Sequence, residues 1–297
     1  MSAQNPKKLI VIVGPTAIGK TGLSIKLAKY FNCEILSADS RQFYKEMEIG
    51  TAKPSSDEMD GIPHHFVGHL SIKEQYTAGK FEKDAIDKLQ SIYKTQNTAI
   101  LVGGSGLFVN AVCFGLDDIP SNFEIREQLI KELETEGIDK LQFELKNADP
   151  EYYNTADIQN PHRVIRALET YRTSKKPYSS FRNSTQKKRP FEIIWIGLNM
   201  ERDQVYANIN KRVDIMMENG LLEEVKKLEP FKDLNCLKTV GYQEFYQNPE
   251  NITKAVELVK QNTRRFAKRQ ITFFKRNDKI KWFNPNETNE IINYINS

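Results

Sequence analysis

Short runs of apolar residues, each ended by glycine or by polar residues, mark out the first part of the chain. Leu9–Val13 is an uninterrupted aliphatic run that stops at Gly14-Pro15, the pattern of a strand buried on both faces. A helix with apolar residues at helical spacing is predicted over Gly19–Phe31, and two more buried strands at Glu34–Ala38 and Ala99–Val102. Buried strands that alternate with helices indicate a parallel α/β fold.

The pattern changes after Pro120. Residues 121–175 are polar with helical spacing and hold no aliphatic run, and a basic stretch rich in Ser and Asn follows at 179–190. A further strand is predicted at Phe191–Leu198. We therefore expect an α/β core formed by residues 1–115 and 191–297, interrupted by a mainly helical insertion at 116–190.

The C-terminal region is expected to be helical. One helix is predicted over Glu201–Asn219, ended by Gly220, and a long one runs from about Thr253 to Lys275 with Asn251 as its N-cap. A last helix begins near Glu287.

Composition excludes several classes of protein. The 297 residues carry 43 Lys and Arg against 39 Asp and Glu, an ordinary globular balance that argues against wholesale disorder. The longest aliphatic run is far short of the roughly twenty residues that cross a membrane, and its stop at Gly14-Pro15 disfavours a signal peptide. Three widely spaced cysteines form neither a disulfide framework nor a metal-binding pair. We expect a monomeric, cytoplasmic protein.

Basic residues gather in two zones. Lys260–Lys281 holds nine basic residues and one acidic residue, and Arg172–Pro190 holds seven basic residues and no acidic one. Two such zones in a nearly neutral chain favour a polyanionic partner such as nucleic acid over solvated helix faces. Phe266, Phe273 and Phe274 lie within the first zone. Aromatic residues at helical spacing more often pack in a core than stack on bases, so we expect these three in the core.

A phosphate-binding loop follows the first predicted strand. Gly14–Thr21 fits G-x-x-x-x-G-K-[ST] in full, between a buried strand and a helix. Its glycines let backbone N–H groups curl around phosphate oxygens at the N-terminus of a helix, Lys20 supplies a charge, and the Thr21 hydroxyl is placed to ligate Mg²⁺. We therefore expect a P-loop core. Its diphosphate- or nucleotide-binding residues would be Gly14, Pro15, Thr16, Ala17, Ile18, Gly19, Lys20 and Thr21.

The residues at the ends of the other predicted strands disfavour some classes of P-loop protein but leave several functions open. No other predicted strand ends in the second Mg²⁺-binding Asp of most P-loop NTPases, and Asn210–Asp214 is one residue too long for a guanine-reading motif. Asp39 is the only carboxylate at a strand end, where ligands of parallel sheets bind. It is equally suited to be a general base or the cap of the next turn, and Ser105 has the same two readings. Adjacent His64 and His65 fit a structural role better than a metal site.

Further segments extend the pattern along nearly the whole chain: Ser37–Tyr44, Ile49–Pro54, Pro63–His65, Leu101–Leu107, Asn160–Glu169, Thr239–Glu244 and Thr263–Gln270. In this order they resemble the bacterial tRNA dimethylallyltransferases, also called tRNA isopentenyltransferases. The resemblance implies transfer of a dimethylallyl group from dimethylallyl diphosphate to N6 of the adenosine 3′ of the anticodon. The phosphate loop and Mg²⁺ would then hold a diphosphate leaving group, and the target base would be flipped out of the anticodon stem-loop.

The resemblance also implies roles for individual residues. Asp39 would be the general base, and Ser105 would hydrogen-bond at the reaction centre. The tRNA-binding residues would be Asp39, Ser40, Arg41, Gln42, Ser105, Arg126, His162, Arg163, Val164, Ile165, Arg166, Thr239, Val240, Gly241, Tyr242, Gln243, Glu244, Lys268, Arg269, Gln270, Ile271, Thr272, Phe273, Phe274 and Lys275.

Some positions depart from the family pattern, and other functions stay open. Ser105 stands where Thr is common and His162 where Gln is common, and the absence of a C-terminal Cys/His finger predicts no structural zinc. The alternatives are a small-molecule kinase, a non-catalytic RNA-binding module, and a prenyltransferase acting on free AMP or ADP. The basic zone near residues 264–276 favours tRNA over a free nucleotide.

Overall fold

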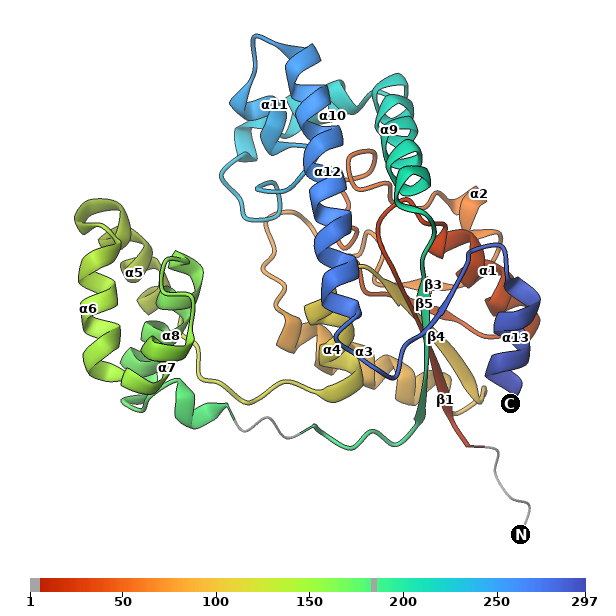
Figure 1. Cartoon of the computed structure of the whole chain (residues 1–297), viewed down its shortest axis with the longest axis horizontal. Helices are drawn as coiled ribbons and strands as arrows, with labels where there is room; N and C mark the ends of the chain where they lie inside the picture. The colour runs from red at the N-terminus through yellow and green to blue at the C-terminus, as the bar shows by residue number, and fades with distance from the viewer. Residues whose placement is uncertain (1–5, 183–185) are drawn as a thin grey trace. The chain divides into compact units, whose positions relative to one another are not determined.

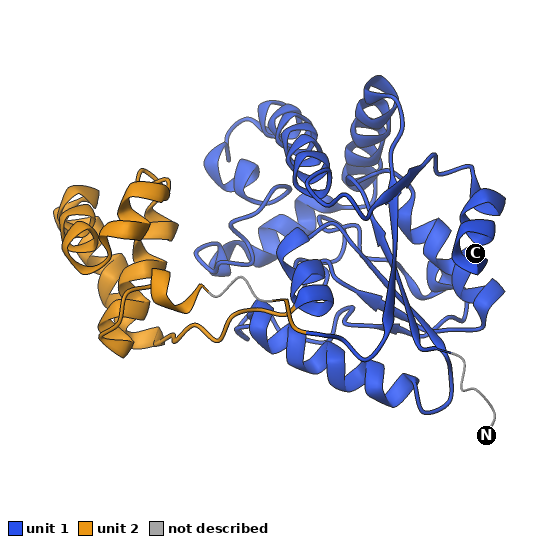
Figure 2. Ribbon diagram, turned by 60° about the horizontal axis from the view of Figure 1, so that its bottom comes forward, with its two compact units in different colours: residues 1–114, 188–297 blue, residues 115–187 orange. Residues whose placement is uncertain are grey.

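The chain divides into two compact units. The computed structural model describes residues 6–182 and 186–297. Unit 1 comprises Met1–Phe114 and Lys188–Ser297, and unit 2 comprises Gly115–Lys187, as the two colours of Figure 2 show. Unit 2 thus covers most of the insertion expected at 116–190. Residues 183–185 of the predicted basic stretch lie outside the described residues.

The strands of unit 1 form one six-stranded sheet with the order β3-β2-β4-β1-β5-β6. Every pairing in it is parallel, and the central strand β1 pairs with β4 on one side and β5 on the other. The parallel α/β fold is therefore confirmed. The strands are β1 (Lys8–Val13), β2 (Ile35–Ser37), β3 (His64–His65), β4 (Thr98–Gly103), β5 (Glu192–Leu198) and β6 (Lys281–Phe283).

Helices surround this sheet and extend beyond it. In unit 1 they are α1 (Lys20–Phe31), α2 (Ser56–Met59), α3 (Ala78–Ile92), α4 (Gly106–Phe114), α9 (Arg202–Glu218), α10 (Leu221–Leu228), η2 (Glu229–Phe231), α11 (Gln243–Gln247), α12 (Ile252–Phe274) and α13 (Thr288–Asn296). Asn251 caps α12 as expected, because its side chain accepts a hydrogen bond from the Lys254 N–H at 2.9 Å. Gly220, at φ 95°, separates α9 from α10.

The aliphatic run of β1 has no exposure on either face of the sheet. Ile10 and Ile12 belong to a hydrophobic cluster with α1 and α13, whereas Leu9, Val11 and Val13 belong to a second cluster with α3 and α4. Burying each such side chain contributes roughly 1.5–3 kcal/mol. The run therefore fixes the centre of the sheet and, with it, the position of the loop that follows at Gly14.

Two edge strands were not predicted from the sequence. β3 has two residues and β6 has three, too short to give a recognisable apolar run. Both pair only at the outer edges of the sheet, next to β2 and β5. The four longer or more central strands were predicted within about two residues of their observed ends.

Unit 2 has a small hydrophobic core of its own, built around Leu129, Leu141, Leu145 and Leu168. Its helices are α5 (Phe123–Glu136), α6 (Ile138–Ala148), α7 (Pro150–Thr155), α8 (Pro161–Ser174) and η1 (Ser179–Phe181). Charged hydrogen bonds join three of these helices: the Arg172 guanidinium donates to Glu132 and Glu144 over 2.5–2.9 Å.

Within residues 6–182 and 186–297, none of the helices combines the length and the apolar character that a membrane span requires.

Candidate functional site

A cleft of about 1160 Å³ lies at the carboxyl ends of the strands of unit 1. Its walls come from the phosphate loop, the segments after β2 and β4, the turn at residues 48–53, and helices α9 and α12, which lie side by side in Figure 1. Sequence segments far apart in the chain therefore meet where ligands of parallel sheets bind.

The phosphate loop has the conformation that its glycines allow. Gly14 and Gly19 have φ values of 151° and 95°, and a Cβ on Gly14 would lie 2.8 Å from the Leu198 carbonyl oxygen. The Lys20 ammonium donates hydrogen bonds to the carbonyl oxygens of Gly14 at 3.0 Å and Pro15 at 2.7 Å. The backbone of the loop thus holds the Lys20 side chain.

Burial lowers the pKa of Lys20, the Asp39 carboxylate opposes this change and the neighbouring Arg212 adds to it, so that the pKa falls from 10.5 to about 8 in all. The ammonium is therefore close to titration in the free protein. A bound anion would replace the missing solvation and raise this pKa again.

Arg212, on α9, was not predicted as a site residue. Its guanidinium donates to the Thr16 hydroxyl at 3.1 Å and to the Thr51 carbonyl oxygen at 3.4 Å. Burial lowers its pKa, but a guanidinium keeps its charge at any physiological pH. The signal in the sequence is an arginine beside the apolar stripe of a predicted helix, since Ile209 and Val213 are buried.

The two predicted catalytic residues lie on the same wall of the cleft. Asp39 Oδ1 accepts the Arg41 N–H at 3.0 Å, so this carboxylate caps the turn and still faces the cleft. Ser105 Oγ accepts the Ser40 N–H at 3.1 Å and lies 3.2 Å from the Ser40 hydroxyl. For Asp39 the two interpretations of the sequence are compatible, because the contact that caps the turn leaves the carboxylate at the cleft. The Ser105 hydroxyl is held at the cleft by its contacts with Ser40.

Two glutamines that were predicted to contact tRNA join parts of the cleft, and their contact with RNA stays a prediction. Gln270 accepts the Thr16 N–H at 2.9 Å and donates to the Gly104 carbonyl oxygen at 3.0 Å, and it is buried. The Gln42 amide donates to the carbonyl oxygens of Thr51 and Ala52 at 3.1 and 3.0 Å. Both amides are thus engaged within unit 1.

One expectation about the aromatic residues of α12 is wrong. Phe274 is in the core, but Phe266 and Phe273 are 38% and 37% exposed and line the cleft. The buried stripe of α12 runs through Ala267, Gln270 and Phe274, so the other two rings fall beside it. The Phe273 ring occupies the space above Gly106, where a Cβ would lie 2.1 Å from it.

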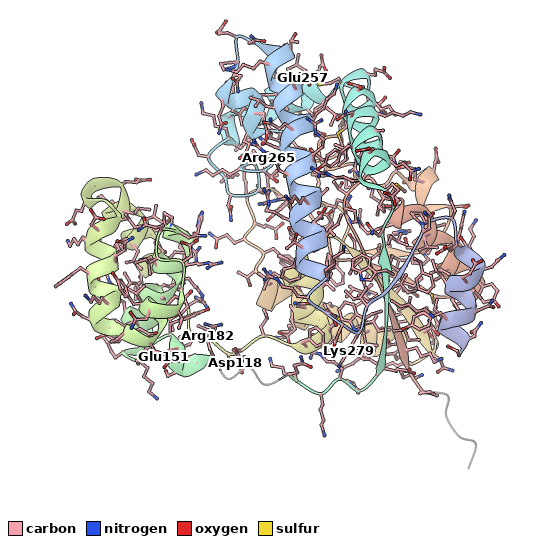
Figure 3. All side chains as sticks on the ribbon, in the orientation of Figure 1. Asp118, Glu151, Arg182, Glu257, Arg265 and Lys279 are labelled. Atoms are coloured by element: carbon pink, nitrogen blue, oxygen red, sulfur yellow. The ribbon has the colours of Figure 1, made fainter. Side chains whose placement is uncertain are left out.

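The remaining predicted tRNA contacts in unit 1 differ in exposure, and contact with RNA stays a prediction for all of them. The side chains of Tyr242, Glu244 and Phe274 are buried and present no free surface. Gln243 and Ile271 are half-buried. Others line the cleft or are exposed on α12 or just after it: Ser40, Arg41, Thr239, Val240, Gly241, Lys268, Arg269, Thr272, Phe273 and Lys275. Arg265, labelled in Figure 3, is also exposed on α12.

The predicted tRNA contacts in unit 2 also include both exposed and buried residues. His162 and Arg163 are exposed at the start of α8, whereas Val164 and Ile165 are in the core of the unit. Arg166 pairs with buried Glu169 at 3.0 Å and donates to the carbonyl oxygens of Ile119 and Pro120. Arg126 pairs with the same carboxylate at 3.1 Å.

The adjacent histidines form structural contacts. His65 Nε2 lies 2.6 Å from the Glu34 carboxylate, and His64 Nδ1 lies 2.8 Å from the Ile62 carbonyl oxygen. Among the described residues, no group of three or more His, Cys, Asp or Glu side chains is arranged to hold a metal ion.

Comparisons with known proteins agree on one family. A family model described as IPP transferase matches residues 42–277. The tRNA dimethylallyltransferase of Christiangramia forsetii is 52% identical over 97% of this chain and 97% of its own. The full-length tRNA isopentenylpyrophosphate transferase of Bacillus halodurans superposes with a TM-score of 0.71 at 37% identity, covering 98% of this chain and 96% of its own. A eukaryotic dimethylallyltransferase acting on tRNA gives a TM-score of 0.79 at 27% identity, covering 96% and 75% of the two chains.

The lowered pKa of Lys20 predicts how diphosphate binding depends on pH. An anion binds the protonated lysine, so inorganic pyrophosphate should bind with proton uptake near pH 8, and Lys20 should contribute less affinity as pH rises above that value. Titration calorimetry at pH 7–9.5, in two buffers of different ionisation enthalpy, measures both effects.

Lys20→Arg is the matched control, because arginine stays charged throughout this range and the titration of pyrophosphate itself is common to both proteins. The wild type should take up more protons than this variant. Equal uptake by the two proteins would show that Lys20 does not titrate on binding.

Proposed function

The chain belongs to the tRNA dimethylallyltransferases, which are prenyltransferases, and from that premise we propose that it transfers the dimethylallyl group of dimethylallyl diphosphate to N6 of the adenosine 3′ of the tRNA anticodon. The observation that carries the proposal is the meeting, in one cleft, of the phosphate loop with the Asp39 carboxylate and the Ser105 hydroxyl. This arrangement would provide a binding site for a diphosphate, with a carboxylate beside it that can act as a general base.

The diphosphate of the donor would lie in the loop Gly14–Thr21. On binding, Lys20 would exchange the Gly14 and Pro15 carbonyl oxygens for phosphate oxygens, and Arg212 would add a second fixed charge. Negative charge accumulates on the diphosphate as the C–O bond breaks. Cations that are already in place stabilise this charge without reorganisation, and this lowers the barrier.

We propose Mg²⁺ as the cofactor, with Thr21 as its protein ligand. The Thr21 side chain is exposed at the first turn of α1 and lines the cleft, as does Asp39. A few hard oxygen donors of this kind fit Mg²⁺, which usually takes one or two protein ligands and completes its shell with phosphates and water. When bound, the ion would neutralise part of the diphosphate charge.

The transfer is a substitution at the first carbon of the prenyl group. The N6 lone pair forms the new C–N bond, the C–O bond breaks, and its electron pair leaves with the diphosphate. The proton that N6 loses passes to the Asp39 carboxylate, which the Arg41 N–H holds in place. Ser105 would orient the amine, and the adenine reaches the cleft by leaving its base stack.

The acceptor would be bound through the sugar-phosphate backbone of the anticodon stem-loop. Exposed basic residues beside the cleft support this assignment, among them Arg265, Lys268, Arg269 and Lys275. Such contacts release counterions from the RNA, so affinity should depend steeply on salt.

Labelled dimethylallyl diphosphate and unmodified tRNA test the function directly. The wild type should label tRNA in a Mg²⁺-dependent reaction. Transfer to AMP but not to tRNA would identify a free-nucleotide prenyltransferase, and phosphorylation of a metabolite by ATP without prenyl transfer would identify a kinase.

Asp39→Asn tests the general base. Asparagine keeps an oxygen that can accept the Arg41 N–H but cannot take a proton from N6, so kcat should fall by about 10²–10⁴-fold while tRNA affinity changes little. Single-turnover transfer and filter binding measure the two quantities. Asp278→Asn, an exposed substitution outside the cleft, is the control. A variant at position 39 with unchanged turnover would remove Asp39 from this role.

Replacing Arg265 and Arg269 together by Gln should weaken tRNA binding and reduce the slope of log affinity against log salt by about two, because two phosphate contacts are lost. Both side chains are exposed on α12. Filter binding over a range of salt concentrations measures the slope, and the double substitution Lys26→Gln with Lys83→Gln, at two exposed lysines on α1 and α3, is the charge-matched control. An unchanged slope would mean that the two arginines are only solvated.

A further inference from the structure

Glu224, on α10, has a carboxylate that accepts four hydrogen bonds from a cleft wall and its support. Oε2 accepts the N–H groups of Glu48 at 2.9 Å and Ile49 at 2.8 Å, and Oε1 accepts the Gly50 N–H at 2.9 Å. Oε1 also accepts the Tyr242 hydroxyl at 2.7 Å. Consecutive backbone N–H groups that converge in this way form an anion-binding arrangement, here filled by a side chain of the protein itself.

The turn held by Glu224, residues 48–53, is bound from its other side as well. Its carbonyl oxygens at Thr51 and Ala52 accept hydrogen bonds from Gln42, and that of Thr51 also accepts one from Arg212. Ala52 has a φ of 46°, which is uncommon for a residue other than glycine. Contacts on both sides therefore hold the turn in a conformation that its sequence does not favour.

Tyr242 fits against this turn with no spare room. Its side chain is fully buried, and a Cβ on Gly50 would lie 2.6 Å from the phenol ring. Gly241, at φ 99°, donates its N–H to Glu244 at 2.9 Å. Tyr242, from the segment Thr239–Glu244 that the family resemblance assigns to tRNA, thus packs against the 48–53 turn.

We propose that Glu224 is a positioning residue for the prenyl donor: with Tyr242 it fixes the 48–53 turn, so that the Thr51 carbonyl oxygen keeps the Arg212 guanidinium at the phosphate loop. The connection runs from α10 through the turn to Arg212, and from Arg212 to the Thr16 hydroxyl at 3.1 Å. The proposal rests on the proposed function in one respect, because it takes Arg212 as a contact for the diphosphate.

A role through Arg212 differs from a role in stability alone. If Glu224 only stabilised the fold, its loss would reduce the active fraction and affect every substrate alike. If it positions Arg212, its loss should weaken donor binding selectively. The effect should also depend on Arg212 being present.

Glu224→Gln is the first test. Glutamine has a single acceptor oxygen and no charge, so it cannot hold all four donors. We expect KM for dimethylallyl diphosphate and Kd for inorganic pyrophosphate to rise about tenfold, with kcat and tRNA affinity changed less than about twofold. Tyr242→Phe removes one hydrogen bond and keeps the ring against Gly50, so the same selective change should be smaller. Glu223→Gln, on the neighbouring exposed residue, is the matched control and should behave as wild type.

A double-mutant cycle with Arg212→Gln tests the route. In that background, Glu224→Gln should raise the Kd for pyrophosphate by less than about twofold, because the group it positions is already absent. If the fold-increases in Kd caused by Glu224→Gln and Arg212→Gln multiply in the double variant, the proposal is overturned. An unchanged Kd for pyrophosphate in both Glu224→Gln and Tyr242→Phe, or a parallel loss of donor binding, turnover and tRNA affinity, would also overturn it.

The pyrophosphate measurements need no prenyl transfer, so they separate this inference from the proposed function. If the wild type fails to prenylate tRNA, the proposed function fails, while the binding cycle still gives a result for Glu224.

Discussion

Two half-buried cationic side chains, Lys20 and Arg212, lie at the phosphate loop. Hydrogen bonds from the loop and from the 48–53 turn hold them in this position. Removing a cation from water is costly unless hydrogen bonds and opposite charge compensate for the loss. The loop's own carbonyl oxygens compensate Lys20, and the Thr16 hydroxyl and Thr51 carbonyl oxygen compensate Arg212. Asp39 contributes opposite charge to both. A bound diphosphate would add negative charge beside these two cations, and the proposed chemistry of the cleft depends on that attraction.

The walls of the cleft are joined by neutral amides. Gln270 connects the phosphate loop to the turn after β4, and Gln42 connects the segment after β2 to the 48–53 turn. An amide both donates and accepts, so it can join backbone segments without adding charge next to the proposed diphosphate site. The Glu224 carboxylate, which does carry charge, binds the turn through the N–H groups of residues 48–50.

The sequence was informative where a signal is local. The aliphatic run Leu9–Val13, the phosphate loop and the Asn251 cap each determine their own structure, and all lie where expected. The sequence was uninformative where contacts with residues distant in the chain determine the position of a side chain. The proposed role of Arg212 depends on its contact with the loop across α9, and Phe273 faces the cleft because Gly106 on α4 leaves space for its ring. The spacing along each helix places these side chains beside a buried stripe, but it does not show what they contact.

The two carbonyl contacts of Lys20 have a consequence for anion selectivity. An anion that binds the ammonium displaces it from two carbonyl oxygens, and each of these hydrogen bonds contributes roughly 1.5–3 kcal/mol because its donor is charged. Chloride or another small monovalent ion offers one charge and no array of oxygens to the surrounding N–H groups, so it recovers little of that loss. A polyvalent phosphate chain offers several charged oxygens, and its contacts more than compensate for the two lost hydrogen bonds. The contacts of Lys20 with the loop backbone thus favour polyvalent phosphates over small monovalent anions.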